Sequence, residues 1–177
     1  VTMIAPTVAT VAPMSASAGQ VLGESTFDYK ALPWHTCESS PAKQDFSIDD
    51  GAFHITVTEP LGADKSKWDL QFRHRNLNFK KGRHVYKVSF EAKSSRDGME
   101  LCSKIGDISG NLEYFSLMSD GSMNMGISMG GQWGSAVKLS TSYKKFSGTF
   151  IPTEDLEATE WCFHYAEDYN DNAGIAR

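Results

Sequence analysis

Apolar and polar residues alternate along short stretches of this chain, and turn residues separate the stretches. Phe53, Ile55 and Val57, for example, alternate with His54 and a pair of threonines. The same pattern recurs over residues 85–93, 100–105, 146–150 and 160–165. A period of two residues is typical of strands that bury one face, and no long helical pattern competes with it. The pattern predicts an all-β chain, an antiparallel β-sandwich of the jelly-roll kind.

One stretch has a face that is dense in hydrogen-bonding groups. Residues 67–82 read KWDLQFRHRNLNFKKG. One alternate set is mostly apolar: Trp68, Leu70, Phe72 and His74. The opposite set is polar: Asp69, Gln71, Arg73 and Arg75. The stretch at 160–165 adds Glu160 and His164, whereas 52–58 and 85–93 carry ordinary Lys, Thr and Ser on their outer faces. We therefore expect one plain sheet and one sheet that presents fixed polar groups.

A second unusual segment is SDGSMNMGISMGGQWG, residues 119–134. Its methionines alternate with polar or small residues from Met123 to Met129, which predicts a strand. Glycines then surround Trp133 and leave it little local structure in which to be buried. An exposed indole is costly unless it contacts a ligand. We interpret Trp133 as a binding residue, with a core lid as the alternative.

Composition narrows the class of protein. The length of 177 residues suits one domain, and 40% apolar residues exclude disorder. A net charge of −5 without a basic cluster argues against nucleic acid as a partner. Residues 1–18 are uncharged and end in Ala-Ser-Ala, which indicates the remnant of a secretory signal peptide or a flexible leader. They are too short and too rich in proline to span a membrane, so we expect a secreted protein with one module over 19–177.

Three cysteines, Cys37, Cys102 and Cys162, lie on strand positions with the same parity as the polar face. None belongs to a CxxC or Cys/His zinc pattern. Export permits a disulfide, and three cysteines leave one over. The pattern favours inert or disulfide-bonded cysteines, and it does not choose the pair.

Aromatic rings beside amide, carboxylate and guanidinium groups are the set that sugars need. The C–H face of a pyranose stacks on an aromatic ring, and its hydroxyls both donate and accept hydrogen bonds. Arginine also binds anions, but Asp69 and Glu160 in the set favour a neutral ligand. A polar surface that docks another domain has the same composition, and it remains an alternative.

Four motifs resemble family 4 carbohydrate-binding modules, closest to those at the N-terminus of cellulosomal family 9 cellulases and cellobiohydrolases. They are LPWHTCESSPAKQDFSI (32–48), KWDLQFRHRNL (67–77), SKIGD (103–107) and FHYAED (163–168). The resemblance covers about residues 22–170. It implies a jelly roll whose concave face binds single β-glucan chains, either β-1,4-linked or mixed-linkage. It also implies a module without catalytic activity that targets a covalently linked, downstream cellulase to its substrate.

The resemblance assigns the binding residues one by one. Trp68 matches a tryptophan of the cleft, and Gln71, Arg73 and Arg75 match its polar strand, beside Asp69. Glu160 and His164 fall where relatives carry amides, and Tyr114 and Trp133 fall near a second stacking aromatic. Trp34 matches a core residue. Trp68 shares parity with Leu70 and Phe72, so a bulge or twist is needed to turn it toward the cleft.

The resemblance also implies one more strand, in the sheet opposite the cleft, after the point where this sequence stops. It implies a structural calcium, with Glu24 and Asp45 as weak candidate ligands, and no required cofactor. The chain is then a module that lacks its last strand, or one in which another segment fills the position.

Two other function classes remain open. A jelly-roll glycoside hydrolase needs two carboxylates across the cleft, and Asp69 and Glu160 are the only pair to nominate. The HExxH, GxSxG and phosphate-loop motifs are absent. A structural or adhesion domain would use the arginine face to dock a neighbour. Soluble glucan binding without hydrolysis distinguishes the binding module from both.

Overall fold

The computed structural model describes residues 2–11, 19–22, 27–28, 31–63, 66–82, 84–110, 112–117, 123–128 and 137–166. Its strands are β1 (Thr2–Val11), β2 (Gly19–Gln20), β3 (His35–Glu38), β4 (Lys43–Asp49), β5 (Ala52–Glu59), β6 (Leu70–Phe79), β7 (Val85–Lys93), β8 (Glu100–Asp107), β9 (Leu112–Leu117), β10 (Met123–Ser128), β11 (Val137–Lys138), β12 (Lys144–Phe150) and β13 (Leu156–His164). A 3-10 helix, η1 (Lys67–Asp69), precedes β6. Within these ranges, no helix has the length and apolar character to cross a membrane.

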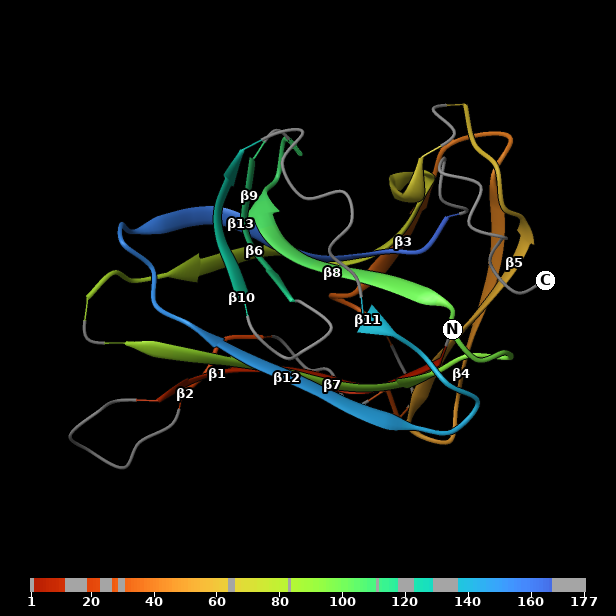
Figure 1. Cartoon of the computed structure of the whole chain (residues 1–177), viewed down its shortest axis with the longest axis horizontal. Coiled ribbons are helices and arrows are strands. Elements are labelled where there is room, and N and C mark those ends of the chain that lie inside the picture. Colours follow the sequence, from red (N-terminus) through yellow and green to blue (C-terminus); the bar gives the residue numbers. More distant parts are fainter. Residues whose placement is uncertain are drawn as a thin grey trace.

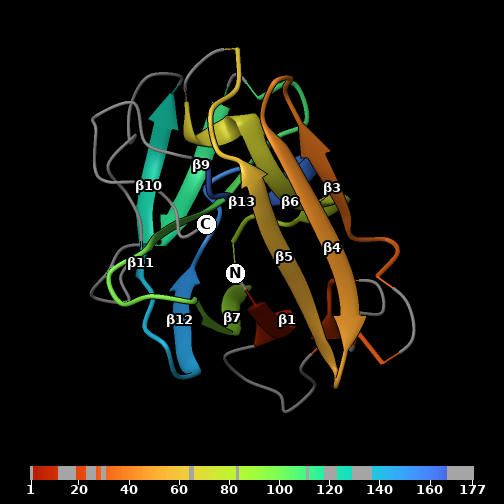
Figure 2. The same cartoon turned by 90° about the vertical axis from the view of Figure 1, so that its right-hand side faces the viewer.

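The strands form two antiparallel sheets that face each other (Figure 1). One sheet has the order β12-β7-β1-β5-β4, with β2 paired to β1. The other, here called the site sheet, has the order β10-β9-β8-β13-β6-β3, with β11 paired to β8. Figure 2 shows β4 and β5 running side by side along one flank of the molecule. The predicted β-sandwich is confirmed.

The core lies between the sheets and is rich in aromatic rings. Phe53 on β5 stacks on Phe72 of β6, with 4.1 Å between ring centroids, so this pair joins the two sheets. Trp34 stacks on the same Phe72 at 4.8 Å. Alternate residues of β7, from Tyr86 to Ala92, are buried as their spacing predicts. Burial of these rings supplies the main driving force that holds the two sheets together.

Residues 2–11 differ from the sequence-based expectation. The sequence predicts a signal remnant or flexible leader over 1–18, and within that segment residues 2–11 form β1 between β5 and β7. The segment is rich in Thr, Val and Ile, which favour strands. Its pairing with β7 shifts register between Ile4 and Thr7, where Pro6 has no N–H to donate. The uncharged composition of residues 2–11 is thus compatible with a strand as well as with a leader.

Candidate functional site

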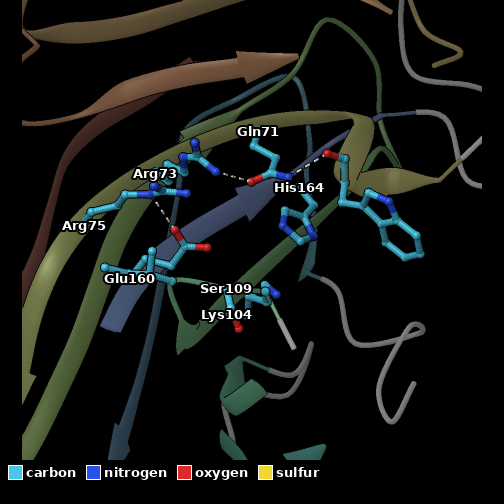
Figure 3. A pocket seen from close by; sticks show the side chains of 10 residues that line it. Gln71, Arg73, Arg75, Lys104, Ser109, Glu160 and His164 are labelled. Carbon is cyan, nitrogen blue, oxygen red and sulfur yellow. Dashed lines mark hydrogen bonds and ion pairs between the residues drawn. The ribbon is translucent and has the colours of Figure 1, made fainter. Parts of the chain in front are cut away.

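A pocket of about 460 Å³ opens on the outer face of the site sheet (Figure 3). Its described lining residues are Trp68, Gln71, Arg73, Arg75, Lys104, Ile108, Ser109, Gly110, Glu160 and His164. They come from η1, β6, β8, the β8–β9 turn and β13. The volume lies within the usual range for small-molecule sites. Side chains from separate parts of the sequence thus converge on one hollow.

The β6 alternation is confirmed from Leu70 onward. Leu70 and Phe72 are fully buried in the core, while Gln71, Arg73 and Arg75 are half-buried and line the pocket. Trp68 also lines the pocket, although it has the parity of the core residues. The reason is that residues 67–69 are η1 and not strand, so the period of two begins only at Leu70.

Asp69 does not belong to the pocket, which corrects its expected place on the polar face. Its side chain is fully buried, and its Oδ2 accepts a hydrogen bond from the Ser66 backbone N–H at 3.1 Å. Its own backbone N–H donates to the Ser66 carbonyl oxygen at 3.0 Å. Gly62 passes so close that an added Cβ would lie 2.4 Å from the Asp69 Cγ. Asp69 therefore stabilises the turn that carries Trp68.

Gln71 connects three neighbours at the pocket floor. Its Nε2 donates to the Trp68 carbonyl oxygen at 2.8 Å. Its Oε1 accepts from Arg73 Nη1 at 3.4 Å and from the Cys162 thiol at 3.2 Å. Figure 3 shows the Gln71 amide pointing toward the guanidinium of Arg73. The amide is held by these contacts, so it fixes the positions of Trp68 and Arg73 relative to each other.

Arg73 is held on its other side by His35 of β3. Its Nε donates to the His35 Nε2 at 2.9 Å, across the register pair that joins β3 to β6. This hydrogen bond requires a neutral imidazole, because a protonated ring has no acceptor nitrogen. Burial lowers the pKa of His35 from 6.5, and the charges of Arg73 and Arg75 lower it further. Sequence reasoning did not nominate His35.

A bulge in β6 places Arg75 beside Glu160. Between the register pairs Trp161–His74 and Thr159–Leu77, β6 has one residue more than β13. The extra residue accompanies a positive φ of 61° at Asn76, a backbone conformation that asparagine tolerates better than most residues. Arg75 Nε then donates to Glu160 Oε2 at 3.1 Å. The pair brings an acid and a base together at the pocket wall, as Figure 3 shows.

Burial shifts the pKa values of Glu160 and His164 in opposite directions. It raises the pKa of Glu160 from 4.5, although Arg73, Arg75 and Lys104 oppose that change. It lowers the pKa of His164 well below 6.5, and the charges of Lys104, Lys67 and Arg73 add to this effect. His164 is therefore neutral, and its buried Nδ1 has no hydrogen-bond partner among the described residues. That nitrogen is itself fully buried, so His164 contributes to the pocket through the rest of its ring.

Lys104 and the β8–β9 turn were missed by sequence reasoning. Lys104 is 5% exposed and alternates with the core residues of β8, so its parity already indicated the site face. The turn that supplies Ile108, Ser109 and Gly110 is closed by Asp107, whose Oδ1 accepts from the Leu112 backbone N–H at 2.7 Å and whose Oδ2 accepts from the Ser109 hydroxyl. The periodicity of apolar and polar residues does not predict how such a turn folds back over a sheet.

The other nominated residues lie elsewhere. Tyr114 is half-buried on β9, packs against the core and is not among the described pocket residues. Trp133 and Glu24 lie outside the described residues. Asp45 is exposed on β4. In the ranges described above, no group of three or more His, Cys, Asp or Glu side chains is arranged to hold a metal ion, and the structural calcium stays a prediction.

The three cysteines are free thiols. Cys102 and Cys162 are buried on neighbouring strands of the site sheet, where Cys162 pairs with Lys104 and Cys102 with His164. Burial raises the pKa of the Cys162 thiol well above its usual value, so the thiol stays protonated and donates to Gln71. The alternative of inert cysteines fits this structure.

The pocket has one carboxylate among its described lining residues, Glu160. The Asp69–Glu160 pair that a hydrolase would need does not form across it, because Asp69 is buried in η1. What the arrangement offers is a half-buried indole, a row of fixed donors and a neutral imidazole. These groups suit the reversible binding of a polar ring.

Comparison with known proteins agrees with this geometry. The cellulose 1,4-beta-cellobiosidase of Acetivibrio thermocellus is 36% identical over 96 residues, which is 50% of this chain and 10% of that enzyme. A solved structure described as "CBM4 structure and function" superposes with a TM-score of 0.58 at 22% identity, over 76% of each chain, and this likeness supports the fold. The sequence profile of the carbohydrate binding domain family CBM_4_9 matches residues 19–168. The chain therefore belongs to this family of carbohydrate-binding modules.

Proposed function

We propose that the pocket of the site sheet binds a single β-glucan chain without cleaving it, and that the module targets an attached cellulase to its substrate. The observation that carries the proposal is the convergence of Trp68 with Gln71, Arg73 and His164 on one hollow. The indole provides the apolar platform for a glucose ring, and the polar groups are held at hydrogen-bonding positions for its hydroxyls. Because the sheet fixes these groups, little ordering entropy is lost on binding.

Two observations support the finer parts of the proposal. The matched enzyme is a cellobiosidase, and this chain spans about a tenth of it, which supports a role as one module of a larger hydrolase. Because a polysaccharide such as cellulose lies outside the cell, secretion of the module is part of the proposal. The single carboxylate of the described pocket supports binding over hydrolysis. β-1,4-Glucan and mixed-linkage β-glucan are the proposed ligands.

Isothermal titration with cellohexaose, barley β-glucan and xylan tests the proposal. We expect exothermic binding of the first two and no release of reducing sugar. The Arg73→Ala variant should bind about tenfold more weakly, since loss of a charged donor typically costs about 1.5 kcal/mol or more. Binding of none of the three polysaccharides would overturn the proposal and turn attention to the polar face as a protein-docking surface.

The affinity for cellohexaose should fall in mild acid. Arg73 is held by neutral His35, and the pKa of His35 lies below 6.5, so the folded module favours the neutral form. The stabilising hydrogen bond between Arg73 and His35 is therefore present at a pH above the ordinary histidine pKa of 6.5. It is lost as the pH falls through the lowered pKa of His35, because His35⁺ repels Arg73. Titrations between about pH 7.5 and 4.5 should show a loss of about fivefold, the typical worth of one hydrogen bond.

The His35→Gln variant provides the control, because its amide oxygen reaches the position of the imidazole Nε2 and can accept from Arg73 at every pH in this range. Its affinity profile should be flatter than that of the unmodified protein, while His164, whose pKa is also lowered, keeps its own contribution in both. Melting temperatures at each pH separate lost binding from unfolding. Identical pH profiles of affinity for the two proteins would show that protonation of His35 does not cause the pH dependence.

A further inference from the structure

The charge of the pocket differs from the charge expected of the binding residues that were nominated from the sequence. With Asp69 buried in η1, the described lining contains Arg73, Arg75 and Lys104 against the single carboxylate of Glu160. Glu160 is engaged by Arg75 at 3.1 Å. The argument for an uncharged ligand rested on two acids in the binding set, and only one of them is there. The described part of the pocket therefore has an excess of positive charge.

Arg73 is the centre of this excess. Its two side-chain hydrogen bonds to described residues go to neutral acceptors, His35 Nε2 and Gln71 Oε1. Within the residues that the structure describes, no carboxylate lies within 4 Å of its guanidinium. The remaining N–H groups of the fork are left for a ligand, and the fork geometry matches a carboxylate.

The positive charge of Arg73 also acts on the neighbouring imidazoles of His35 and His164. The charge of Arg73 lowers the pKa values of both His35 and His164, in each case in addition to burial. Both imidazoles are thereby kept neutral, so neither is a second cation that competes for the anion. Of the two, His164 lines the pocket, while His35 accepts the hydrogen bond from Arg73.

We propose that this pocket prefers a sugar residue that carries a carboxylate, a hexuronate within or branching from a β-linked chain, with the carboxylate on Arg73 and the ring on Trp68. The proposal rests on the function proposed above and names the substrate class of the same site. The geometry places the Arg73 guanidinium, which has no carboxylate within 4 Å among the described residues, in the same pocket as an aromatic platform. A free inorganic anion would use the guanidinium but not the indole.

The test is a matched pair of ligands in isothermal titration. Cellohexaose is compared with cellohexaose that carries one C6 carboxylate, and unbranched xylohexaose with a glucuronic acid-branched xylo-oligosaccharide of equal backbone length. At about 0.05 M NaCl the carboxylated member of at least one pair should bind about tenfold more tightly, as expected for a charge-assisted hydrogen bond. The pair that shows the preference distinguishes a uronate in the chain from one on a branch. The preference should shrink at about 0.5 M NaCl, because salt screens the charge.

Two variants identify the residue responsible. Arg73→Gln should abolish the preference for the carboxylated ligand, and Arg73→Lys should keep part of it. Lys87→Gln is the matched control, since it removes one positive charge from an exposed position on β7 of the opposite sheet and should leave the preference unchanged. A melting curve of each variant establishes that it is folded.

The outcomes separate the two proposals. Equal affinity for both members of each pair, or a preference that survives Arg73→Gln, would overturn the uronate inference while glucan binding stands. Binding of the carboxylated ligands alone would support the inference and contradict neutral β-glucan as the main ligand. Binding of none of the four would overturn both proposals.

Discussion

Trp34→Ala should lower the free energy of unfolding by about 3–5 kcal/mol, the usual cost of removing a large aromatic side chain from a core. Trp34 is 1% exposed. It stacks on Phe72 at 4.8 Å and meets Trp161 edge-on at 5.5 Å. Alanine would leave a cavity beneath the pocket strands β6 and β13. The loss is a large fraction of the ~5–15 kcal/mol that stabilises a typical domain.

Urea unfolding followed by tryptophan fluorescence, with circular dichroism as a second probe, measures this change. Trp34→Phe keeps a ring in the cavity, so it should lose less and remain folded if the alanine variant does not. Leu32→Ala is the control, because Leu32 is 69% exposed two residues away and should change stability by no more than about 0.5 kcal/mol. An alanine variant at Trp34 within 1 kcal/mol of the unmodified protein would contradict the packing described here.

Trp68→Ala should weaken cello-oligosaccharide binding by about 30-fold or more, corresponding to the ~2 kcal/mol typical of a tryptophan at the centre of a binding site. Trp68 is half-buried in the pocket lining and is fixed there by η1 and by the Gln71 Nε2 bond to its carbonyl oxygen. Since it contributes less to the core than Trp34, its removal should change the melting temperature only slightly. The two tryptophan variants thus separate stability from binding.

Affinity measurements on a ring series make the test specific. Trp68→Phe retains a smaller apolar platform and should bind with intermediate affinity. Tyr143→Ala is the matched control: Tyr143 is 40% exposed just before β12 of the opposite sheet, and its loss should leave affinity unchanged. If Trp68→Ala bound cellohexaose as tightly as the unmodified protein, the indole would not be the sugar platform.

Much of the fold was readable from the sequence because strand alternation is a local property. Phe53 to Val57 and Tyr86 to Ala92 bury the residues that the period of two assigns to the core. The same period brought Gln71, Arg73 and Arg75 to one face, and their place in the pocket agrees with it. The resemblance of four motifs to family 4 modules supplied the family. For Trp133, the sequence-based role remains a prediction.

The sequence by itself determined the alternating strands after residue 50, their buried faces and the polar row of β6, because each depends on neighbours two residues apart, but it did not predict β1. Only the tertiary structure decided which polar groups meet. A single 3-10 turn moves Asp69 into the interior and Trp68 into the pocket. The register of β13 against β6 and β8 sets Glu160 beside Arg75 and brings Lys104 to the same hollow. Pairing between distant strands depends on the balance of the whole core, so the charge of the pocket, and with it the ligand that it prefers, was not readable along the chain.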